Sequence, residues 1–373
     1  MFSLTLVSGT GGMDFEFSAE QDELRATVRR FLTEQAPVTP YVRDMLDDGR
    51  GTTDTVWKGL AELGVIGLLV PEAHGGAGMG MVDMGVVLEE LGRAAHPGPF
   101  LSTAVTAASA LAASGDELLD GVAAGTLIAT VALTEGDGRD WRAVTTRVTN
   151  GRLTGTKTFV PDAGAADVLL VTAEDEDGGL GLYAVETGAE GLVVEPGPGV
   201  DGTRKQGTVR LDATPGRRLG YGAAGALVAE VVDRTLVALV VDGVGAAQTA
   251  LDLAVAYAKE RVQFDKPIGA FQAVQHLCAD MLQALELTRA GAYYALWACD
   301  AASAQERHRA AVMAKAFGGD ALWRVGASAI QVFGGVGFTW EHDVHLFYKR
   351  LLSLQQAYGD AADHLEELAG LIL

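Results

Sequence analysis

The sequence is poor in cysteine and in positive charge. Its 373 residues include two cysteines and 28 Lys and Arg residues, against 49 Asp and Glu residues, so the formal net charge is −21. Cys278 and Cys299 form no Cys-x-x-Cys pair and fit no zinc-ligand spacing, which predicts reduced thiols, no disulfide framework and a reducing, cytoplasmic compartment. Nucleic acid is excluded as a partner, because phosphate binding requires clustered basic residues.

Long uncharged apolar runs are also missing. No stretch reaches the length that a membrane span requires, so we expect no transmembrane segment. The opening residues, MFSLTLVSGTGG, lack the positively charged region of a signal peptide. Met13 precedes a clearer beginning, in which Ser18 caps a predicted helix and acidic residues fill its first turn. The start of the protein therefore stays open between Met1 and Met13.

The spacing of apolar residues changes twice along the chain. Over residues 13–130 they recur at helical spacing, as in EQDELRATVRRFLTEQ. Over residues 131–221, β-branched runs alternate with turn residues, and Asn150-Gly151 predicts a hairpin with a type I′ turn. Over residues 222–373, long helices return that are apolar nearly all round, which is typical of a bundle that also oligomerises. We therefore predict an α+β multidomain protein with a helical domain, a β domain and a helical bundle, in that order.

Two stretches of the C-terminal zone have the residue types of a ligand site. In ERVQFDKPIGAFQAVQH, Arg261 and Phe264 lie three residues apart at a helix end. A cation beside an aromatic ring can bind a phosphate and a flat ring together, although a solvated helix end with a core Phe would give the same pattern. In QVFGGVGFTWEHDVHLFYKR, Gly334 and Gly335 would let a ligand approach the backbone closely. The histidines of this stretch do not have the spacing of a metal site, so no metal is predicted.

Together and in this order, the two stretches resemble the acyl-CoA dehydrogenase family of flavoproteins. The resemblance covers nearly the whole chain from Met13, through FSAEQDELRATVRRFL, LGVIGLLVPEAHGGAGMGMVD and LTGTKTFVPDAGAADVLLVTA. It implies an N-terminal helical domain, a middle antiparallel β-barrel domain and a C-terminal four-helix bundle, assembled as a dimer or tetramer. The implied reaction is the α,β-dehydrogenation of an acyl-CoA thioester, in which a glutamate removes the α proton and FAD accepts the β hydride.

The resemblance further implies that each FAD is shared between neighbouring subunits. One subunit holds the adenosine diphosphate part of its neighbour's FAD through a set of polar, aromatic and glycine positions. Arg261 would neutralise the pyrophosphate, and the paired glycines would leave room for it. All positions of this set keep the family residue: Arg261, Phe264, Gln272, Gln331, Gly334 and Gly335.

The other half of the implied site departs from the family pattern. A TEPxxGSD-like segment reads TEGDGRDW here, and a WITN-like segment reads FVPD, in which Pro161 has no N–H to donate. The catalytic glutamate of a YEG-like segment is replaced by Tyr358 or Gly359. A second family branch places its glutamate near Thr235, where this chain also has no carboxylate.

Three interpretations stay open. The preferred one is an FAD-dependent acyl-CoA dehydrogenase subunit that lacks the catalytic Glu, completes the FAD site of a second subunit of the same fold in an α2β2 enzyme, and passes electrons to an electron-transfer flavoprotein. By resemblance alone, its substrates would be bulky steroid side-chain CoA thioesters. The second is a self-sufficient homo-oligomer with a displaced base, Asp360, or else Asp233 or Asp242; Asp360 is also a natural N-cap of a last helix. The third is a flavin-free structural homologue, against which the intact set of positions argues.

Overall fold

The N-terminal part of the chain is helical, and its first helix begins as predicted. The computed structural model describes residues 17–220 and 224–372, so the choice between Met1 and Met13 lies outside the described residues. The Ser18 hydroxyl accepts a hydrogen bond from the Gln21 backbone N–H at 3.2 Å, and the Gln21 side chain accepts one from the Ser18 N–H at 3.0 Å. This capping box satisfies two N–H groups that a helix start leaves unpaired.

Among the helical elements before the sheet, α4 (Met81–Arg93) is buried along nearly its whole length, and it packs against α1 (Ala19–Gln35) and against the bundle helices α7 (Gly225–Glu260) and α8 (Gln272–Ala301). A Cβ atom at Gly92 would lie 1.9 Å from the Asp242 carbonyl oxygen, and one at Gly245 would lie 1.9 Å from the Glu89 carbonyl oxygen. These two glycines therefore let α4 cross the bundle helix α7 with their backbones in contact. The elements are α1 (Ala19–Gln35), η1 (Val38–Val42), α2 (Arg43–Met45), α3 (Asp54–Glu62), η2 (Glu72–His74), α4 (Met81–Arg93), η3 (Leu101–Ala107), α5 (Ala108–Ser114) and α6 (Leu118–Ala123).

An eight-stranded sheet forms the middle of the chain, in the order β6-β7-β3-β2-β4-β5-β8 with β1 paired to β4. The predicted hairpin at Asn150-Gly151 is confirmed, because both residues have positive φ and Thr149 pairs with Arg152 across the turn. The strands are β1 (Ala129–Ala132), β2 (Arg147–Thr149), β3 (Arg152–Pro161), β4 (Val168–Glu174), β5 (Leu180–Glu186), β6 (Leu192–Pro196), β7 (Gln206–Pro215) and β8 (Arg217–Leu219).

The implied antiparallel barrel is wrong in two respects. β1 and β2 both pair with β4 in parallel, and the end strands β6 and β8 do not pair with each other within the described residues, so the sheet is open. Neighbouring parallel strands need a long connection rather than a tight turn. Residues 133–146 cross between β1 and β2 as an irregular loop, and we name this segment the 133–146 loop.

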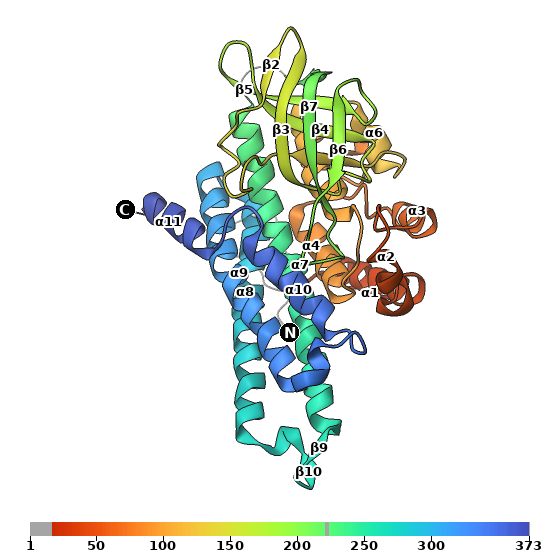
Figure 1. The fold of residues 1–373 in the computed structure, drawn as a ribbon, viewed down its shortest axis with the longest axis vertical. Coiled ribbons are helices and arrows are strands. Elements are labelled where there is room, and N and C mark those ends of the chain that lie inside the picture. The colour runs from red at the N-terminus through yellow and green to blue at the C-terminus, as the bar shows by residue number, and fades with distance from the viewer. Residues whose placement is uncertain (1–16, 221–223, 373) are drawn as a thin grey trace.

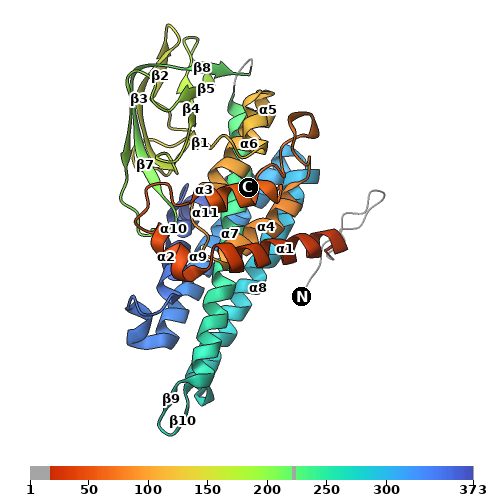
Figure 2. The same ribbon diagram turned by 90° about the vertical axis from the view of Figure 1, so that its right-hand side faces the viewer.

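The C-terminal part is a helical bundle, as predicted. Figures 1 and 2 show the sheet at one end of the molecule and the β9–β10 hairpin, which joins α7 to α8, at the other. No described helix is both long enough and apolar enough to span a bilayer. The division into domains at residues 130 and 221 stays a prediction. The elements are α7 (Gly225–Glu260), β9 (Val262–Gln263), β10 (Lys266–Pro267), η4 (Ile268–Ala270), α8 (Gln272–Ala301), α9 (Ala304–Phe333), η5 (Gly334–Phe338), α10 (Val344–Gln356) and α11 (Ala361–Ile372).

Candidate active site

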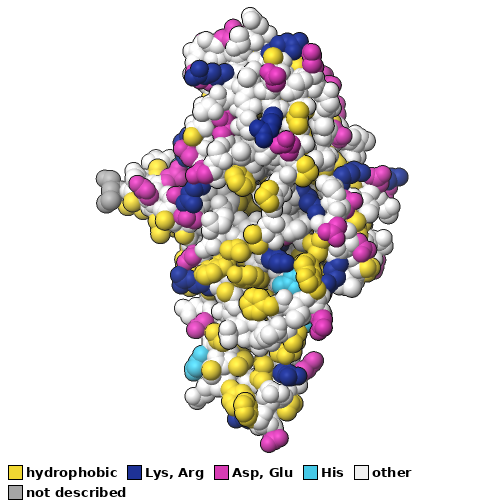
Figure 3. Space-filling view, in the orientation of Figure 1, with side chains coloured by type: hydrophobic (Ala, Val, Ile, Leu, Met, Phe, Trp, Pro, Cys, Tyr) yellow, Lys and Arg dark blue, Asp and Glu magenta, His cyan; other side chains and the backbone are white. Residues whose placement is uncertain are grey.

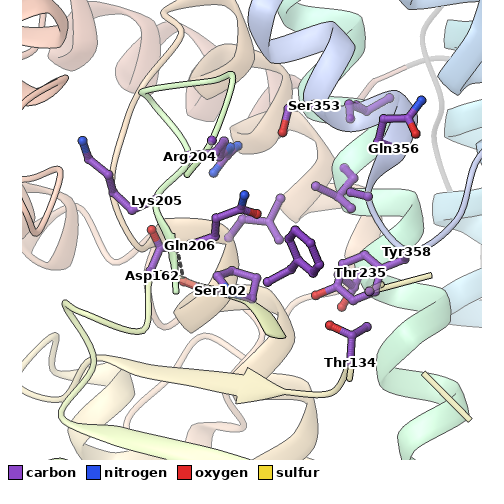
Figure 4. A pocket seen from close by; sticks show the side chains of 18 of the residues that line it. Ser102, Thr134, Asp162, Arg204, Lys205, Gln206, Thr235, Ser353, Gln356 and Tyr358 are labelled. Atoms are coloured by element: carbon purple, nitrogen blue, oxygen red, sulfur yellow. Dashed lines mark hydrogen bonds between the residues drawn. The ribbon is translucent and has the colours of Figure 1, made fainter. Parts of the chain in front are cut away.

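A cavity of about 660 Å³ lies where the helical part, the sheet and the bundle meet, and we name it the central cavity. Its walls come from η3, the 133–146 loop, the end of β3, the loop 197–205 after β6, the middle of α7 and the end of α10. Figure 4 shows that its polar residues come from opposite walls, with Ser102 and Asp162 on one side and Thr235 and Tyr358 on the other. A cavity of this size, with apolar walls and a few polar groups, suits a small-molecule ligand.

The charged floor of the central cavity pairs one carboxylate with two guanidinium groups. Arg350 is 1% exposed and binds Asp242 through Nε–Oδ2 at 2.8 Å and Nη2–Oδ1 at 2.6 Å, and Arg204 Nη2 lies 2.7 Å from Asp242 Oδ1. Burial opposes the charge on Asp242, but the two guanidinium groups outweigh it and lower the pKa of Asp242. Asp242 is therefore a paired anion and is not available to accept a substrate proton.

The second carboxylate of α7 is also committed. Asp233 Oδ1 lies 2.7 Å from His308 Nδ1, and Asp233 Oδ2 accepts a hydrogen bond from Arg307 at 3.1 Å. His308 Nε2 lies 3.2 Å from Glu367 of α11, so the imidazole connects α7, α9 and α11. Thr235, where the resemblance implies an alternative glutamate position, donates its hydroxyl to the Val231 carbonyl at 2.7 Å.

Asp360 caps α11 and pairs with a cation. Its Oδ1 accepts hydrogen bonds from the backbone N–H groups of Ala362 at 2.8 Å and Asp363 at 3.2 Å. Its Oδ2 lies 2.8 Å from Arg139 Nη2, on the 133–146 loop, and this hydrogen bond lowers the pKa of Asp360. Asp360 lines neither the central cavity nor the smaller cavity beside it. The structure thus shows Asp360 in the helix-capping role that the sequence predicts.

Asp162 is a cavity carboxyl that the sequence pattern did not single out. It is 3% exposed, follows Pro161 at the end of β3, and has its pKa raised by burial. Its Oδ2 lies 2.6 Å from Ser102 Oγ, which in turn lies 3.1 Å from the Pro99 carbonyl oxygen. The Ser102 hydroxyl is within donating distance of both oxygens, and its hydrogen bond to Asp162 opposes the rise that burial causes in the pKa of Asp162. The only sequence signal was an acid in the FVPD segment.

The far end of the bundle carries the positions that the sequence resemblance predicts for a neighbour's cofactor. We name this region, residues 261–272 and 331–335, the bundle tip. Phe264 and Asp265 form a two-residue turn between the paired residues Gln263 and Lys266, and both have positive φ (54° and 62°). Such a turn favours Asn or Gly, so a Phe there is strained, and strain of this kind gathers at functional sites. The turn leaves the Phe264 ring 86% exposed.

The other predicted binding positions of the bundle tip are also exposed, namely Arg261, Gln272, Gln331, Gly334 and Gly335. Among the described residues, the Arg261 guanidinium has neither a hydrogen-bond nor an ion-pair partner. Tyr257 of α7 stacks on Phe333 of α9 with ring centroids 4.4 Å apart, which brings the Gln331–Gly335 segment beside the end of α7. A Cβ atom added at Gly334 or Gly335 would meet nothing within 4 Å. Figure 3 shows hydrophobic side chains gathered over the same lower half of the molecule.

The bundle tip is remote from the chain's own central cavity. Asp242 lies within helix α7, and Arg261 caps the C-terminal end of the same helix. At about 1.5 Å per residue, the helix separates them by about 28 Å. The structure therefore brings the predicted binding positions together with one another, and sets them apart from the cavity of the same chain.

Comparison with known proteins places these features in a family. Residues 18–119 match the acyl-CoA dehydrogenase N-terminal domain, and residues 225–370 match the acyl-CoA dehydrogenase C-terminal domain. Acyl-CoA dehydrogenase FadE34 of Mycobacterium tuberculosis is 35% identical over 94% of this chain, which spans only 48% of FadE34. Acyl-CoA dehydrogenase IpdE2 of Mycolicibacterium smegmatis is 31% identical over 94% of this chain and 98% of that protein.

Solved structures agree with this comparison. A variant of the Tcur3481–Tcur3483 steroid ACAD superposes with a TM-score of 0.86 and is 33% identical, covering 95% of this chain and 97% of that chain. The ChsE4–ChsE5 complex of Mycobacterium tuberculosis contains a chain with a TM-score of 0.85 and 27% identity, covering 96% of this chain and 98% of that chain.

Proposed function

Because the chain belongs to the acyl-CoA dehydrogenase family, whose members are oxidoreductases acting on CH–CH groups, we propose that it takes part in the α,β-dehydrogenation of an acyl-CoA thioester as a subunit without its own catalytic base. One observation carries the proposal. The bundle tip has an exposed, unpaired guanidinium at Arg261, whereas Asp233, Asp242 and Asp360 are all bound to cations within the described part of the chain.

The bundle tip fits the adenosine diphosphate part of an FAD held mainly by a neighbouring subunit. A free, exposed guanidinium such as that of Arg261 suits a pyrophosphate, which it can bind through several N–H groups. The open space at Gly334 and Gly335 leaves room for phosphate oxygens beside the backbone. The exposed amides of Gln272 and Gln331 would add further hydrogen-bonding groups. When bound, FAD supplies the acceptor for the β hydride.

The central cavity does not fit a flavin ring in the same way. Pro161 has no N–H, the Thr134 hydroxyl donates to the Thr158 carbonyl at 2.7 Å, and the Thr130 hydroxyl donates to the Pro161 carbonyl at 2.7 Å. These donors are used within the chain and are not free for flavin nitrogens or oxygens. We infer that the second subunit provides both the flavin-ring pocket and the glutamate base.

The proposed assembly is a heteromer of two chains of this fold, in an α2β2 arrangement. The names of two structurally similar proteins, Tcur3481–Tcur3483 and ChsE4–ChsE5, each pair two gene products, and the first is called a steroid ACAD. This supports a bulky, steroid-like acyl group as the substrate class. We also propose an electron-transfer flavoprotein as the electron acceptor, and the cytoplasm as the compartment.

Co-expression tests the proposal. The chain would be purified alone and together with a chain of the same fold that keeps the family glutamate, and each sample would be assayed for flavin absorbance and for reduction by acyl-CoA. We expect a colourless chain alone and a yellow, active complex. A yellow homo-oligomer that oxidises acyl-CoA would favour the displaced-base interpretation instead, and absence of flavin from every complex would favour a structural homologue.

A further inference from the structure

The turn at Tyr358 and Gly359 forms part of a wall between two cavities. The central cavity is lined by Tyr358 and Arg139, and the same two residues line a second cavity of about 380 Å³ between the 133–146 loop, α7, α9 and α11. The sequence resemblance implies a catalytic glutamate in this segment. Here the side chain that reaches both cavities is a phenol.

The backbone of this turn is strained and held from several sides. Tyr358 has φ +57°, a left-handed conformation that side-chain-bearing residues rarely adopt, and Gly359 follows with φ +97°. The buried Lys315 ammonium donates to the Gly359 carbonyl at 2.8 Å and to the Gln355 carbonyl at 3.2 Å. Asp360 fixes the following residue by capping α11 and binding Arg139. Strained residues held in this way are typical of ligand-binding positions.

The Tyr358 hydroxyl is available to a ligand. Within residues 17–220 and 224–372 it has no hydrogen-bond partner, although it lines both cavities. Burial raises the pKa of Tyr358 well above its usual value, so the hydroxyl keeps its proton. By contrast, the buried charges of the central cavity are paired, as in Asp242 with Arg350. A ligand there would meet apolar walls, the neutral donor of Tyr358, and one buried carboxyl, that of Asp162, whose Oδ1 has no partner among the described residues.

We propose that Tyr358 donates a hydrogen bond to the carbonyl oxygen of an uncharged, largely apolar ligand bound in this chain's own central cavity. Tyr358 is thereby a ligand-orienting residue in a chain that lacks the base. The proposal does not depend on the heteromeric assembly, because both the cavity and the donor belong to this chain. A volume of about 660 Å³ accepts a ligand with several fused rings.

The test compares a ketone with a hydrocarbon of the same shape. Acetylnaphthalene and ethylnaphthalene would be titrated into the full chain and into its Tyr358→Phe variant, with binding followed by probe fluorescence. A net neutral hydrogen bond is worth about 1 kcal/mol, so we expect Tyr358→Phe to weaken acetylnaphthalene binding about three- to tenfold and to leave ethylnaphthalene binding unchanged. The infrared carbonyl band of bound acetylnaphthalene should lie lower with the wild-type chain than with the variant.

Two matched variants locate the effect. Tyr348→Phe changes a half-buried tyrosine of α10 that lines neither cavity, and should leave both affinities unchanged. Leu239→Trp fills the central cavity and should abolish binding of both probes; circular dichroism would verify that each variant folds. An unchanged ketone-to-hydrocarbon ratio and carbonyl band in Tyr358→Phe would overturn the proposal. So would failure of the wild-type chain to bind acetylnaphthalene, or binding that survives Leu239→Trp.

Discussion

The bundle tip and the central cavity differ in whether their charged groups are exposed and whether they are paired. At the bundle tip, Arg261 is exposed and unpaired among the described residues, and Phe264 is held outward on a strained turn. In the central cavity, Arg350 and Asp242 are buried and bound to each other. Water stabilises an exposed cation without a partner, but backbone strain such as that at Phe264 gathers at sites that bind something else. The difference therefore suggests that one region serves a neighbour and the other serves the chain's own stability and a neutral ligand.

The largest expected effect is a loss of stability when the buried ion pair of the central cavity is disrupted. Arg350→Met leaves the buried Asp242 carboxylate with only Arg204 as a partner, and removing one member of a buried ion pair costs about 3–5 kcal/mol. We expect the free energy of unfolding in urea to fall by about that amount. The control Arg324→Met removes a guanidinium that is 69% exposed and should change stability by less than about 0.5 kcal/mol. Equal losses in the two variants would mean that the charged floor is not a structural element.

The next effect tests the bundle tip. Arg261→Ala removes the free guanidinium, and a hydrogen bond to a charged group is worth about 1.5–3 kcal/mol, so FAD should be retained about ten- to a hundredfold more weakly by the assembled complex. The measurement is the flavin absorbance that remains after gel filtration at a series of dilutions. Arg147→Ala, at a residue 71% exposed on β2, is the matched control and should keep its flavin. Full retention by the Arg261 variant would remove the reason for assigning the bundle tip to a cofactor.

A pH-dependent effect concerns the docking of α11 beside the cavity. Hydrogen bonds to Asp233 and Glu367 raise the pKa of His308 from 6.5 to about 9. The contribution of His308 is therefore fully present below pH 6.5 and is lost as the pH rises through 9. Lys315, whose pKa is lowered by burial from 10.5 to about 7, acts in the opposite direction, because stability rises as it loses its proton above pH 7.

The His308 contribution is isolated by a difference measurement. The stability gap between the wild-type chain and His308→Gln should be about 1–2 kcal/mol below pH 6.5, after allowance for partial exposure of the pair, and should shrink above pH 9. Unfolding in urea across this pH range checks it, and Lys315 contributes equally to both proteins and cancels. A gap that grows with pH would contradict the assigned hydrogen bonds.

The smallest expected effect, that of Asp360→Asn, separates a helix-capping role for this residue from a catalytic one. Asn caps a helix about as well as Asp, so Asp360→Asn loses mainly the ion pair to Arg139, which is partly exposed and worth at most about 1 kcal/mol. We expect nearly unchanged stability and unchanged dehydrogenation by the complex. A displaced base at Asp360 requires instead that activity collapse by orders of magnitude while the flavin stays bound, which steady-state assays would reveal.

The features that could be predicted from the sequence depend on neighbouring residues. The Ser18 capping box, the Asn150-Gly151 turn and the cap at Asp360 each involve residues within a few positions of one another. The roles assigned to Arg261 and Phe264 stay predictions, although the structure gathers them at one end of the bundle. The long helices were predicted from their continuous apolar pattern.

The features that could not be predicted depend on residues far apart in the chain. Arg139 meets Asp360 across 221 positions, and Arg350 meets Asp242 across 108. No local pattern encodes such pairs. The parallel pairing of β1 with β4 is non-local in the same way, so β-branched runs gave the strands but not their partners. Asp162 was passed over because its burial beside Ser102 follows from packing between η3 and β3.

The flavin content of the assembled enzyme tests most directly whether this chain provides only a bundle tip while a second subunit provides the flavin-ring pocket. The complex of this chain with the proposed glutamate-bearing subunit would be purified, and bound FAD counted against each chain by absorbance and amino-acid analysis. The account predicts one FAD for each pair of unlike chains, because this chain contributes a bundle tip but no flavin-ring pocket. One FAD for every chain of either kind would contradict it.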